Sequence, residues 1–268
     1  MEGFYPSFTN VSARTSKNGN FHEKMALTTC TRAIYSSRWA RHTAIDCYGI
    51  DGDKLDVVNF GANVAVSYDE DQIMKLAKKR WEEKEKHLLF VGVEWERKGG
   101  PKALEAVRIL AGRGYPVKLA VAGCQPGLSE EEKKAARLYG YLSKKDAGQA
   151  ERLRRLYEES FLFFMPSLYE CTAIVYAEAA AFGLPSVASD AGGVSNMVIE
   201  GESGLLLAVP VPKNHCMQQA AVYLGERGRA GGPGAGSRGE RETKNPLVPA
   251  AMLSLSGQPG RRFGKRKP

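Results

Sequence analysis

Residues 161–190 read FLFFMPSLYECTAIVYAEAAAFGLPSVASD, and this stretch decides the fold. It opens with a short apolar run, FLFFMPS, that predicts a buried strand. TAIVYAEAAAFG then predicts a helix, and LPSVASD predicts a second strand. Strands that alternate with helices over short loops form βαβ units with parallel strands. The stretch therefore predicts one such unit.

The same alternation continues on both sides of this unit. Before it, a helix ending at Gly49 is followed by a strand and a turn in DKLDVVNFGAN (53–63). Around it, strands are predicted at 87–92, 116–123 and 204–209, and helices at 100–114, 146–160 and 194–201. The sequence therefore predicts an α/β fold, with a Rossmann-like parallel sheet and helices on both faces.

The composition is that of a soluble globular protein, with 43% hydrophobic and 25% charged residues among 268. The longest apolar runs are shorter than the roughly 20 residues that span a bilayer. EGFYPSFTN, after the first Met, has neither a basic start nor an apolar stretch of the secretory type. The five cysteines form no C-x-x-C pair, which favours reduced thiols and a cytoplasmic location.

The net charge of +8 comes from the end of the chain. Residues 226–268 hold ten Lys or Arg against three Glu, which leaves 28 basic and 27 acidic residues before them. Gly and Pro make up 14 of these 43 residues, so we expect a disordered basic tail. Its GAGSRG matches a dinucleotide-binding pattern but lacks the flanking strand and helix. Phe263 is its one aromatic residue, so no specific nucleic-acid binding is expected.

Two acids, Glu170 and Glu178, stand eight positions apart around the start of the predicted helix in the opening stretch. Ligands of open α/β sheets bind outside the carboxyl ends of the strands, and helix starts offer free N–H groups to phosphates. The N–H groups of residues 171–175 are expected to suit a diphosphate. Glu170 and Glu178 would then accept hydrogen bonds from hydroxyls of a sugar and a ribose. The alternative is that Glu170 only complements the helix dipole and Glu178 is a solvated helix residue.

The acidic pair resembles the E-x7-E signature of glycosyltransferase family 4, retaining enzymes of GT-B architecture. Residues 166–207 are similar to the family's donor-site block, and LLFVGVEWERKGGPKALEAV (88–107) to its phosphate-binding loop. Residues 36–63 resemble the segment that joins the family's two domains. In all, the resemblance covers about residues 1–210. It implies that a nucleotide-diphosphate sugar is the substrate, with no metal and no further cofactor.

The resemblance also implies a role for each matching residue. Glu170 would contact the donor sugar, Glu178 the ribose, and Arg97 and Lys98 the diphosphate and leaving group. The remaining donor-binding residues are Gly92, the base-facing Tyr141, Leu142 and Ser143, and the diphosphate-binding backbone of Cys171, Thr172, Ala173 and Ile174.

Three positions depart from the family pattern or imitate another one. Val93 stands where the family commonly has Arg, and ECTA where it often has E-x-F-G. Asp51-Gly52-Asp53 spells a metal-binding D-x-D, but Asp and Gly favour a turn there.

The domains follow from the same resemblance. Residues 1–65 are expected to be a remnant of an acceptor domain with the interdomain segment, 66–225 the donor-binding domain, and 226–268 the tail. The implied function is transfer of a hexosyl-type sugar with retention, weak or absent in the isolated chain. The alternative is a non-catalytic nucleotide-sugar-binding half-domain that needs a partner chain. The sugar, the base, the carbohydrate, lipid or small-molecule acceptor, membrane-surface association and the oligomeric state stay open.

Overall fold

The structure is a computed structural model, and it describes residues 12–209. The predicted basic tail and its GAGSRG lie outside the described residues. In the described part, no helix combines the length and the apolar character that a membrane span requires.

Six parallel strands form the main sheet, in the order β5-β4-β3-β6-β7-β8. The strands are β3 (Lys86–Val91), β4 (Val117–Ala122), β5 (Ala136–Gly140), β6 (Leu162–Met165), β7 (Ser186–Ser189) and β8 (Gly204–Leu207). β3 is the first of them in the chain and lies inside the sheet, between β4 and β6. The predicted parallel sheet is confirmed.

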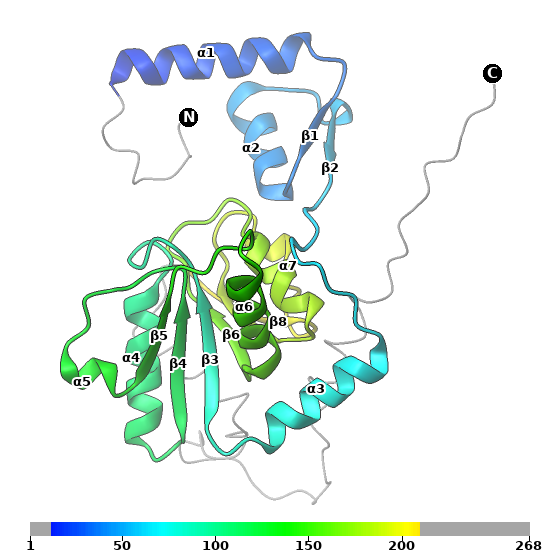
Figure 1. Cartoon of the computed structure of the whole chain (residues 1–268). Coiled ribbons are helices and arrows are strands. Elements are labelled where there is room, and N and C mark those ends of the chain that lie inside the picture. The colour runs from blue at the N-terminus through cyan, green and yellow to red at the C-terminus, as the bar shows by residue number, and fades with distance from the viewer. Residues whose placement is uncertain (1–11, 210–268) are drawn as a thin grey trace, which may run out of the picture.

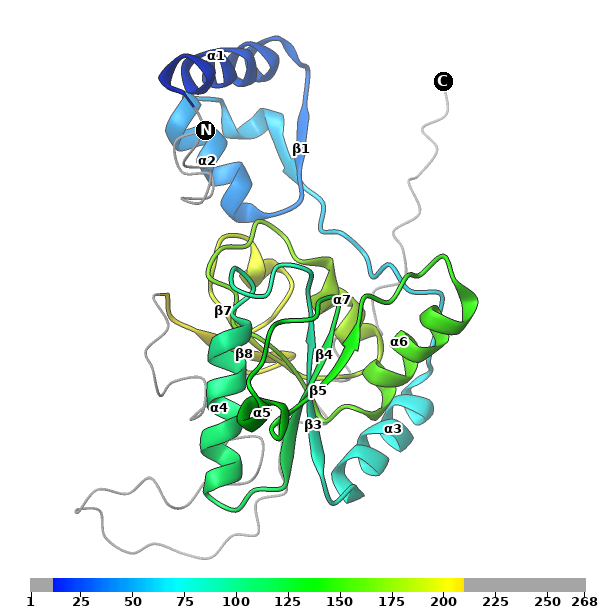
Figure 2. The same ribbon diagram turned by 60° about the vertical axis from the view of Figure 1, so that its left-hand side comes forward.

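Helices cover both faces of this sheet. They are α3 (Glu70–Glu82), α4 (Gly100–Gly112), α5 (Glu130–Lys133), α6 (Ala147–Glu159), α7 (Ile174–Ala181) and the 3₁₀ turn η2 (Val194–Asn196). Figure 2 shows α4 on one side of the sheet and α3 and α6 on the other. This arrangement confirms the predicted Rossmann-like architecture with helices on both faces. The segment 194–201, predicted as a short helix, is helical only at η2.

The core lies between the sheet and these helices, and aromatic rings fill it. On the α6 side the ring of Tyr157 stacks on that of Phe182, with centroids 5.2 Å apart, and on that of Phe163 at 6.1 Å. Tyr176 of α7 meets Phe163 edge to face at 5.4 Å. Stacked and edge-to-face rings of this kind pack densely and fix the positions of α6 and α7 on the sheet.

Arg80 of α3 is a charged residue inside this core, only 3% exposed. Its guanidinium donates hydrogen bonds of 2.8–3.0 Å to four carbonyl oxygens, those of Tyr157, Glu158, Phe182 and Gly183. These carbonyls belong to the ends of α6 and α7, where helices leave oxygens without a partner. Burial lowers the pKa of Arg80 to about 10. Arg80 therefore fastens three helices together.

A smaller unit precedes the main sheet: α1 (Ala13–Thr29), β1 (Ala33–Tyr35), α2 (Arg38–Tyr48), the 3₁₀ turn η1 (Gly52–Lys54) and β2 (Leu55–Val57). β1 and β2 pair in parallel, with Ala33 opposite Leu55. We call residues 12–57 the N-terminal unit and residues 68–209 the body. Figure 1 shows the N-terminal unit above the carboxyl ends of the body's strands.

Two turn predictions can be compared with this unit. α2 ends at Gly49, whose φ of 66° is the left-handed conformation that glycine adopts at little cost, so the predicted helix end is confirmed. Asp51-Gly52-Asp53 leads into η1, and the Asp51 carboxylate accepts a hydrogen bond of 3.0 Å from the N–H of Asp53. Asp51 therefore caps a turn, as the sequence predicts.

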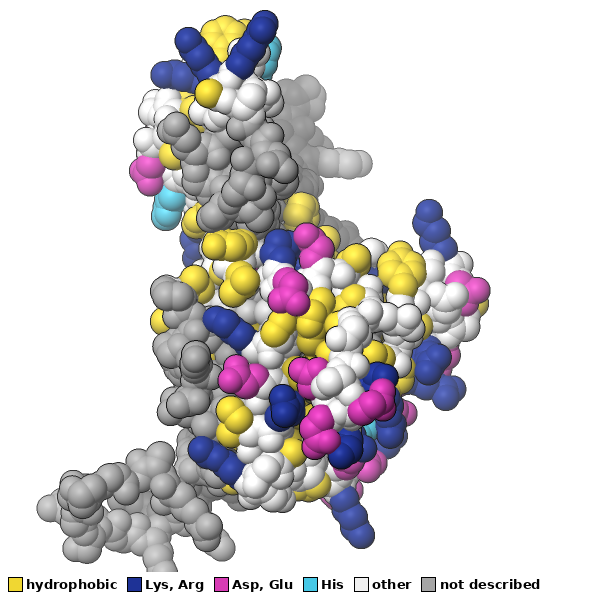
Figure 3. Space-filling model, turned by 90° about the vertical axis from the view of Figure 1, so that its left-hand side faces the viewer, with side chains coloured by type: hydrophobic (Ala, Val, Ile, Leu, Met, Phe, Trp, Pro, Cys, Tyr) yellow, Lys and Arg dark blue, Asp and Glu magenta, His cyan; other side chains and the backbone are white. Residues whose placement is uncertain are grey.

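The surface of the body carries both signs of charge. Figure 3 shows acidic and basic side chains interspersed over one of its sides, with hydrophobic side chains between them. This pattern agrees with the nearly equal numbers of basic and acidic residues before residue 226.

Candidate functional site

The stretch that opens the sequence analysis forms the floor of the site. β6 ends at Met165, and a loop leads to α7, which begins at Ile174 with Ala173 as its N-cap. The predicted start at Thr172 or Ala173 is therefore one or two residues early. Ala173 has no side chain that could cap the helix. The first-turn N–H groups of α7 thus depend on a partner other than a capping side chain.

Two glycines after β7 hold the loop before α7 in place. A Cβ on Gly192, whose φ is 59°, would lie 2.0 Å from the carbonyl oxygen of Glu170. A Cβ on Gly193 would lie 2.1 Å from that of Cys171. Only glycine permits this close approach of the two backbones. The GG pair is thus a structural requirement of the loop that carries Glu170.

Glu170 is buried, 8% exposed, and its partners are cationic. The Lys98 ammonium forms an ion pair with its Oε2, and Nη1 of Arg97 lies 3.6 Å from the same oxygen. The three residues predicted as catalytic therefore lie together. Arg97 is also held by Glu94, whose Oε2 accepts from Nε at 2.8 Å, and by the Tyr169 carbonyl, which accepts from Nη1 at 2.9 Å.

Glu178 is more deeply buried, 2% exposed, so it is not a solvated helix residue. The ammonium of Lys144 forms an ion pair with its Oε1, and the hydroxyl of Tyr157 donates to its Oε2 at 3.1 Å. Burial, and next the charge of Glu178, raises the pKa of Tyr157 well above its usual value. Tyr157 thus remains a protonated hydrogen-bond donor at neutral pH. The sequence analysis names neither Lys144 nor Tyr157.

A cavity of about 260 Å³ opens at the carboxyl ends of β3 and β4, between Lys98 and Glu178. Its lining residues are Val91, Gly92, Val93, Lys98, Ala122, Gly123, Tyr141, Leu142, Lys144, Leu153, Val175 and Glu178. We call it the donor cavity, after the ligand that the sequence resemblance implies. Its position at the strand ends matches the place where open α/β sheets bind ligands. Val175 brings the first turn of α7 to its wall.

Five of the twelve predicted site residues line this cavity. Gly92, Tyr141, Leu142, Lys98 and Glu178 line it. Ser143 is not among the lining residues; its N–H donates to the side chain of Gln149 at 2.8 Å, and its hydroxyl accepts from Lys145. Glu170, Arg97 and residues 171–174 are also absent from the lining. Glu170 is joined to the lining by its ion pair with Lys98, and residues 171–174 follow Glu170 in the chain.

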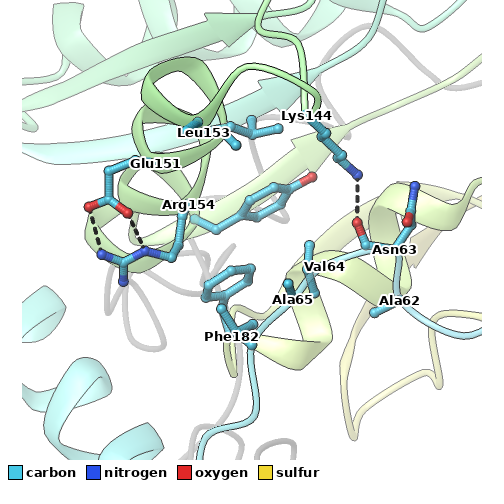
Figure 4. Close-up of a pocket in the computed structure, with 13 residues that line it drawn as sticks. Ala62, Asn63, Val64, Ala65, Lys144, Glu151, Leu153, Arg154 and Phe182 are labelled. Atoms are coloured by element: carbon cyan, nitrogen blue, oxygen red, sulfur yellow. Dashed lines mark hydrogen bonds and ion pairs between the residues drawn. The ribbon is translucent and has the colours of Figure 1, made fainter.

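A second cavity, of about 520 Å³, shares Lys144 and Leu153 with the lining of the donor cavity (Figure 4). Its walls are residues 62–66, which connect the N-terminal unit to the body, and the side of α6. Figure 4 shows Lys144 pointing toward Asn63, whose carbonyl oxygen accepts a hydrogen bond of 3.0 Å from the ammonium. Lys144 therefore touches Glu178, the donor cavity and the connecting segment at once.

The N-terminal unit reaches the same loops. The hydroxyl of Ser36 lies 3.0 Å from that of Thr172, and the N–H of Arg38 donates to the side chain of Asn196 at 3.0 Å. Asn59 and Asn196 exchange two further hydrogen bonds, of 3.2 and 3.3 Å. The loop that begins α7 is thus bounded on one side by the N-terminal unit.

The chemistry available in the donor cavity is anion and hydroxyl binding. Lys98 and Lys144 are the cations of its lining, Glu178 is the acid, and a helix start lies beside them. Among residues 12–209, no three His, Cys, Asp or Glu side chains gather as a metal-ion site. The arrangement therefore suits a ligand with phosphate groups and hydroxyls.

Known proteins are similar to this chain in sequence and in fold. The family model of the glycosyl transferases group 1 matches residues 71–215, more than half of the chain. A D-inositol 3-phosphate glycosyltransferase of Frankia alni is 30% identical over 255 residues, which cover 86% of this chain and 62% of that protein. The chain thus spans less than two thirds of that relative's length.

Solved structures show the same fold at lower identity. A glycosyltransferase from Rickettsia africae superposes with a TM-score of 0.61 at 14% identity, over 87% of this chain and 60% of that one. Anabaena HepE in complex with UDP gives a TM-score of 0.60 at 16% identity, also over 87% and 60%. At these identities the likeness to both structures is one of fold. The chain belongs to the glycosyl transferases group 1 family.

Proposed function

We propose that the chain binds a nucleotide-diphosphate sugar and acts as the donor half of a retaining, hexosyltransferase-type glycosyltransferase. One observation carries the proposal. Two buried acids, Glu170 and Glu178, each paired with a lysine, flank the start of a helix at the carboxyl edge of a parallel sheet. Buried carboxylates are costly unless they are paired and hydrogen-bonded, and these two lie at the strand edge where open α/β sheets bind ligands.

The roles in this proposal follow the geometry. Glu178 accepts hydrogen bonds from the ribose hydroxyls, because a carboxylate has about four lone-pair positions and Lys144 and Tyr157 occupy only part of them. Glu170 does the same for the donor sugar beside Lys98. The base lies against Tyr141 and Leu142, at the outer wall of the donor cavity.

Breaking the bond between sugar and diphosphate leaves negative charge on the departing phosphate. Lys98, with the first-turn N–H groups of α7, stabilises that charge from fixed positions, which lowers the barrier. Arg97 contributes from further away, since Glu94 and the Tyr169 carbonyl hold its guanidinium. The acceptor attacks the donor sugar from the side of the N-terminal unit.

We also keep the division into an acceptor-domain remnant (1–65), a donor-binding domain (66–225) and a tail (226–268) as a proposal. Two separate sheets support the first boundary, because β1 and β2 share no strand pairing with the main sheet. Transfer requires donor and acceptor in one cleft, so we expect little activity from this chain alone. A cytoplasmic location, and any contact with a membrane surface, stay predictions.

Calorimetric titration with UDP, GDP and ADP tests the nucleotide part of this proposal. UDP is the first choice because HepE, a protein of the same fold, was solved with it. One nucleotide should bind, and Glu178→Gln should weaken it by about 10-fold or more, as expected for a lost charge-assisted hydrogen bond. Glu202→Gln, on an exposed loop, is the matched control and should change nothing. A folded protein that binds none of the three contradicts the proposal.

A second candidate function is a nucleotide-sugar-binding half-domain without transfer activity, completed by a partner chain. Exposed apolar side chains favour it: Ile34, on β1 of the N-terminal unit, is 69% exposed, and Phe60, on the connecting segment, is 52% exposed. Hydrolysis and transfer assays with the donor of the preferred nucleotide separate the two candidates. The second candidate is supported if the chain binds the donor but neither hydrolyses it nor transfers its sugar to any added acceptor.

A further inference from the structure

Three basic residues, Arg97, Lys98 and Lys144, lie in or next to the donor cavity, and they differ in their contacts. Arg97 is bound by Glu94 and the Tyr169 carbonyl and is not among the residues that line the donor cavity. Val93, at the place where the family commonly has Arg, is 67% exposed and lines the cavity with an apolar side chain. Of the two basic residues that the sequence points to, Lys98 alone reaches the cavity.

Lys144 supplies a second cation to the same cavity from a different loop. It comes from the loop after β5, whereas Lys98 comes from the loop after β3. Its side chain is 37% exposed, so part of it faces solvent in the cavity mouth. Glu178, its ion-pair partner, lies one turn beyond Val175 on α7. The ammonium is therefore close to the helix start.

The hydrogen bonds of Lys144 leave room for a further acceptor. An ammonium has three N–H donors. Two have partners, the carboxylate of Glu178 and the carbonyl oxygen of Asn63. These two contacts hold the flexible lysine stem in one place, so its remaining donor is positioned before a ligand arrives.

We propose that Lys144 is a phosphate-binding residue of the donor site, which takes with Lys98 the place that the sequence assigns to Arg97. This inference rests on the proposed function. The two lysines approach the diphosphate from two different loops, while the carboxylate of Glu178, beside Lys144, accepts from the ribose. The Lys144 ammonium compensates the buried carboxylate of Glu178 before the anion binds and stays beside it afterwards. Glu178 therefore keeps its ion-pair partner.

Comparing a diphosphate with its nucleoside tests this inference. The probes are UDP and uridine, or the corresponding pair if GDP or ADP binds better, measured by calorimetry or by competition. Lys144→Met should weaken UDP binding by about 10- to 100-fold, as expected when a charged partner of a phosphate is lost. Uridine binding should change by less than about 2-fold. Lys144→Arg should restore most of the affinity for UDP, since it keeps the charge.

Three further variants keep the result interpretable. Lys145→Met, the adjacent exposed lysine, is the matched control and should leave both affinities unchanged. Lys144→Met leaves Glu178 buried beside Tyr157 alone, so the double variant Lys144→Met/Glu178→Gln removes that charge if the single variant folds poorly. Measured against Glu178→Gln, the double variant should lose UDP affinity while uridine affinity stays the same. Arg97→Met should weaken UDP binding less than Lys144→Met does.

Each other outcome overturns the inference. An equal loss for UDP and uridine means that Lys144 acts only by orienting Glu178 toward the ribose. Unchanged UDP affinity in Lys144→Met means that its ion pair is structural, while the proposed function stands on the wild-type binding. If the wild-type protein binds none of UDP, GDP and ADP, the proposed function fails, and this inference with it.

Discussion

The body and the N-terminal unit both contain parallel strands, but they are stabilised to very different degrees. In the body, strands such as β3 and β6 are buried on both faces, and aromatic rings from α6 and α7 pack against them. In the N-terminal unit the buried core is a single cluster of Leu27, Ala44, Ile50 and Leu55. Phe21 and Ile34 are 63% and 69% exposed there.

Parallel sheets are normally covered on both faces. The body meets this condition, and its donor cavity therefore rests on rigid elements. The N-terminal unit meets it less well. It contacts the body through the polar contacts of Ser36 and Arg38, and Asn59 of the connecting segment adds another. The difference teaches that the donor cavity is built mainly on the body, with Asn63 of the connecting segment as a contact of Lys144, and we expect the N-terminal unit to open or shift more easily than the body. Four experiments can break or sharpen this comparison.

The largest expected effect is in the body. Arg80→Met leaves the carbonyl oxygens of Tyr157, Glu158, Phe182 and Gly183 without their donor, and unsatisfied buried groups cost about 1–3 kcal/mol each. We expect the free energy of unfolding to fall by about 3 kcal/mol or more, as measured by urea denaturation. Arg155→Met, an exposed arginine of α6, is the control and should stay within about 0.5 kcal/mol of wild type. A loss below about 1 kcal/mol for Arg80→Met would show that α3 is not fastened by this residue.

The second effect concerns the N-terminal unit. Leu55→Ala removes a buried side chain of its small core, which costs about 2–3 kcal/mol. Hydrogen exchange should then speed up in α1, α2 and β2, while β3, β4 and β6 keep their protection, because the two units have separate cores. Equal loss of protection in both units would mean that the chain unfolds as one cooperative body.

A smaller effect is expected at the contact between the units. Asn196→Ala removes an acceptor for the Arg38 N–H and a partner of Asn59, which should cost about 1 kcal/mol. Limited proteolysis in the connecting segment 58–67 should become about 5-fold faster, since cleavage follows the population of the open form. Ser195→Ala, the exposed neighbour, is the control. An unchanged cleavage rate would show that these bonds do not hold the units together.

The smallest effect is a change with pH. The hydrogen bonds from Arg154 and Arg155 lower the pKa of Glu151 on α6 to about 2, and the hydrogen bond from Arg32 lowers that of Asp56 in the N-terminal unit. A lowered carboxyl pKa stabilises the folded state above the unfolded value near 4.5, and this contribution is lost as the pH falls from there toward 2. In an NMR titration, Arg155→Met should raise the pKa of Glu151 and leave that of Asp56 in place. A shift of both would mean that the units are electrostatically coupled.

The sequence predicts most of the body and misses its polar elements, for physical reasons. β3, β4 and β6 are continuous apolar runs, because a strand buried on both faces needs apolar residues throughout. β5 (ARLYG) lies at the sheet edge with Arg137 exposed, so it carries no such signal. α3 and α5, like residues 13–25 of α1 in the N-terminal unit, are dominated by polar and charged residues and carry no such signal either.

The site was predictable where its residues are close in sequence. Glu170 and Glu178 stand out because both fall in an otherwise apolar stretch around one helix start. Lys144 is 34 residues away from Glu178 and is one of two adjacent lysines, so only the folded chain shows which of them faces the acid. Arg97 matches the sequence pattern, but its guanidinium pairs with Glu94, three residues earlier on the same loop. Arg97 is not among the residues that line the cavity.

The strand order has a consequence for how the chain is made. β3 is the first strand of the main sheet to be synthesised, yet its partners β4 and β6 end at residues 122 and 165. At about 5–20 residues per second, β3 waits roughly 4–15 s between its own synthesis and that of β6. Throughout that interval one edge of an apolar strand is open to pairing with other chains. The strand that ends at the donor cavity is thus also the one that most needs protection during translation.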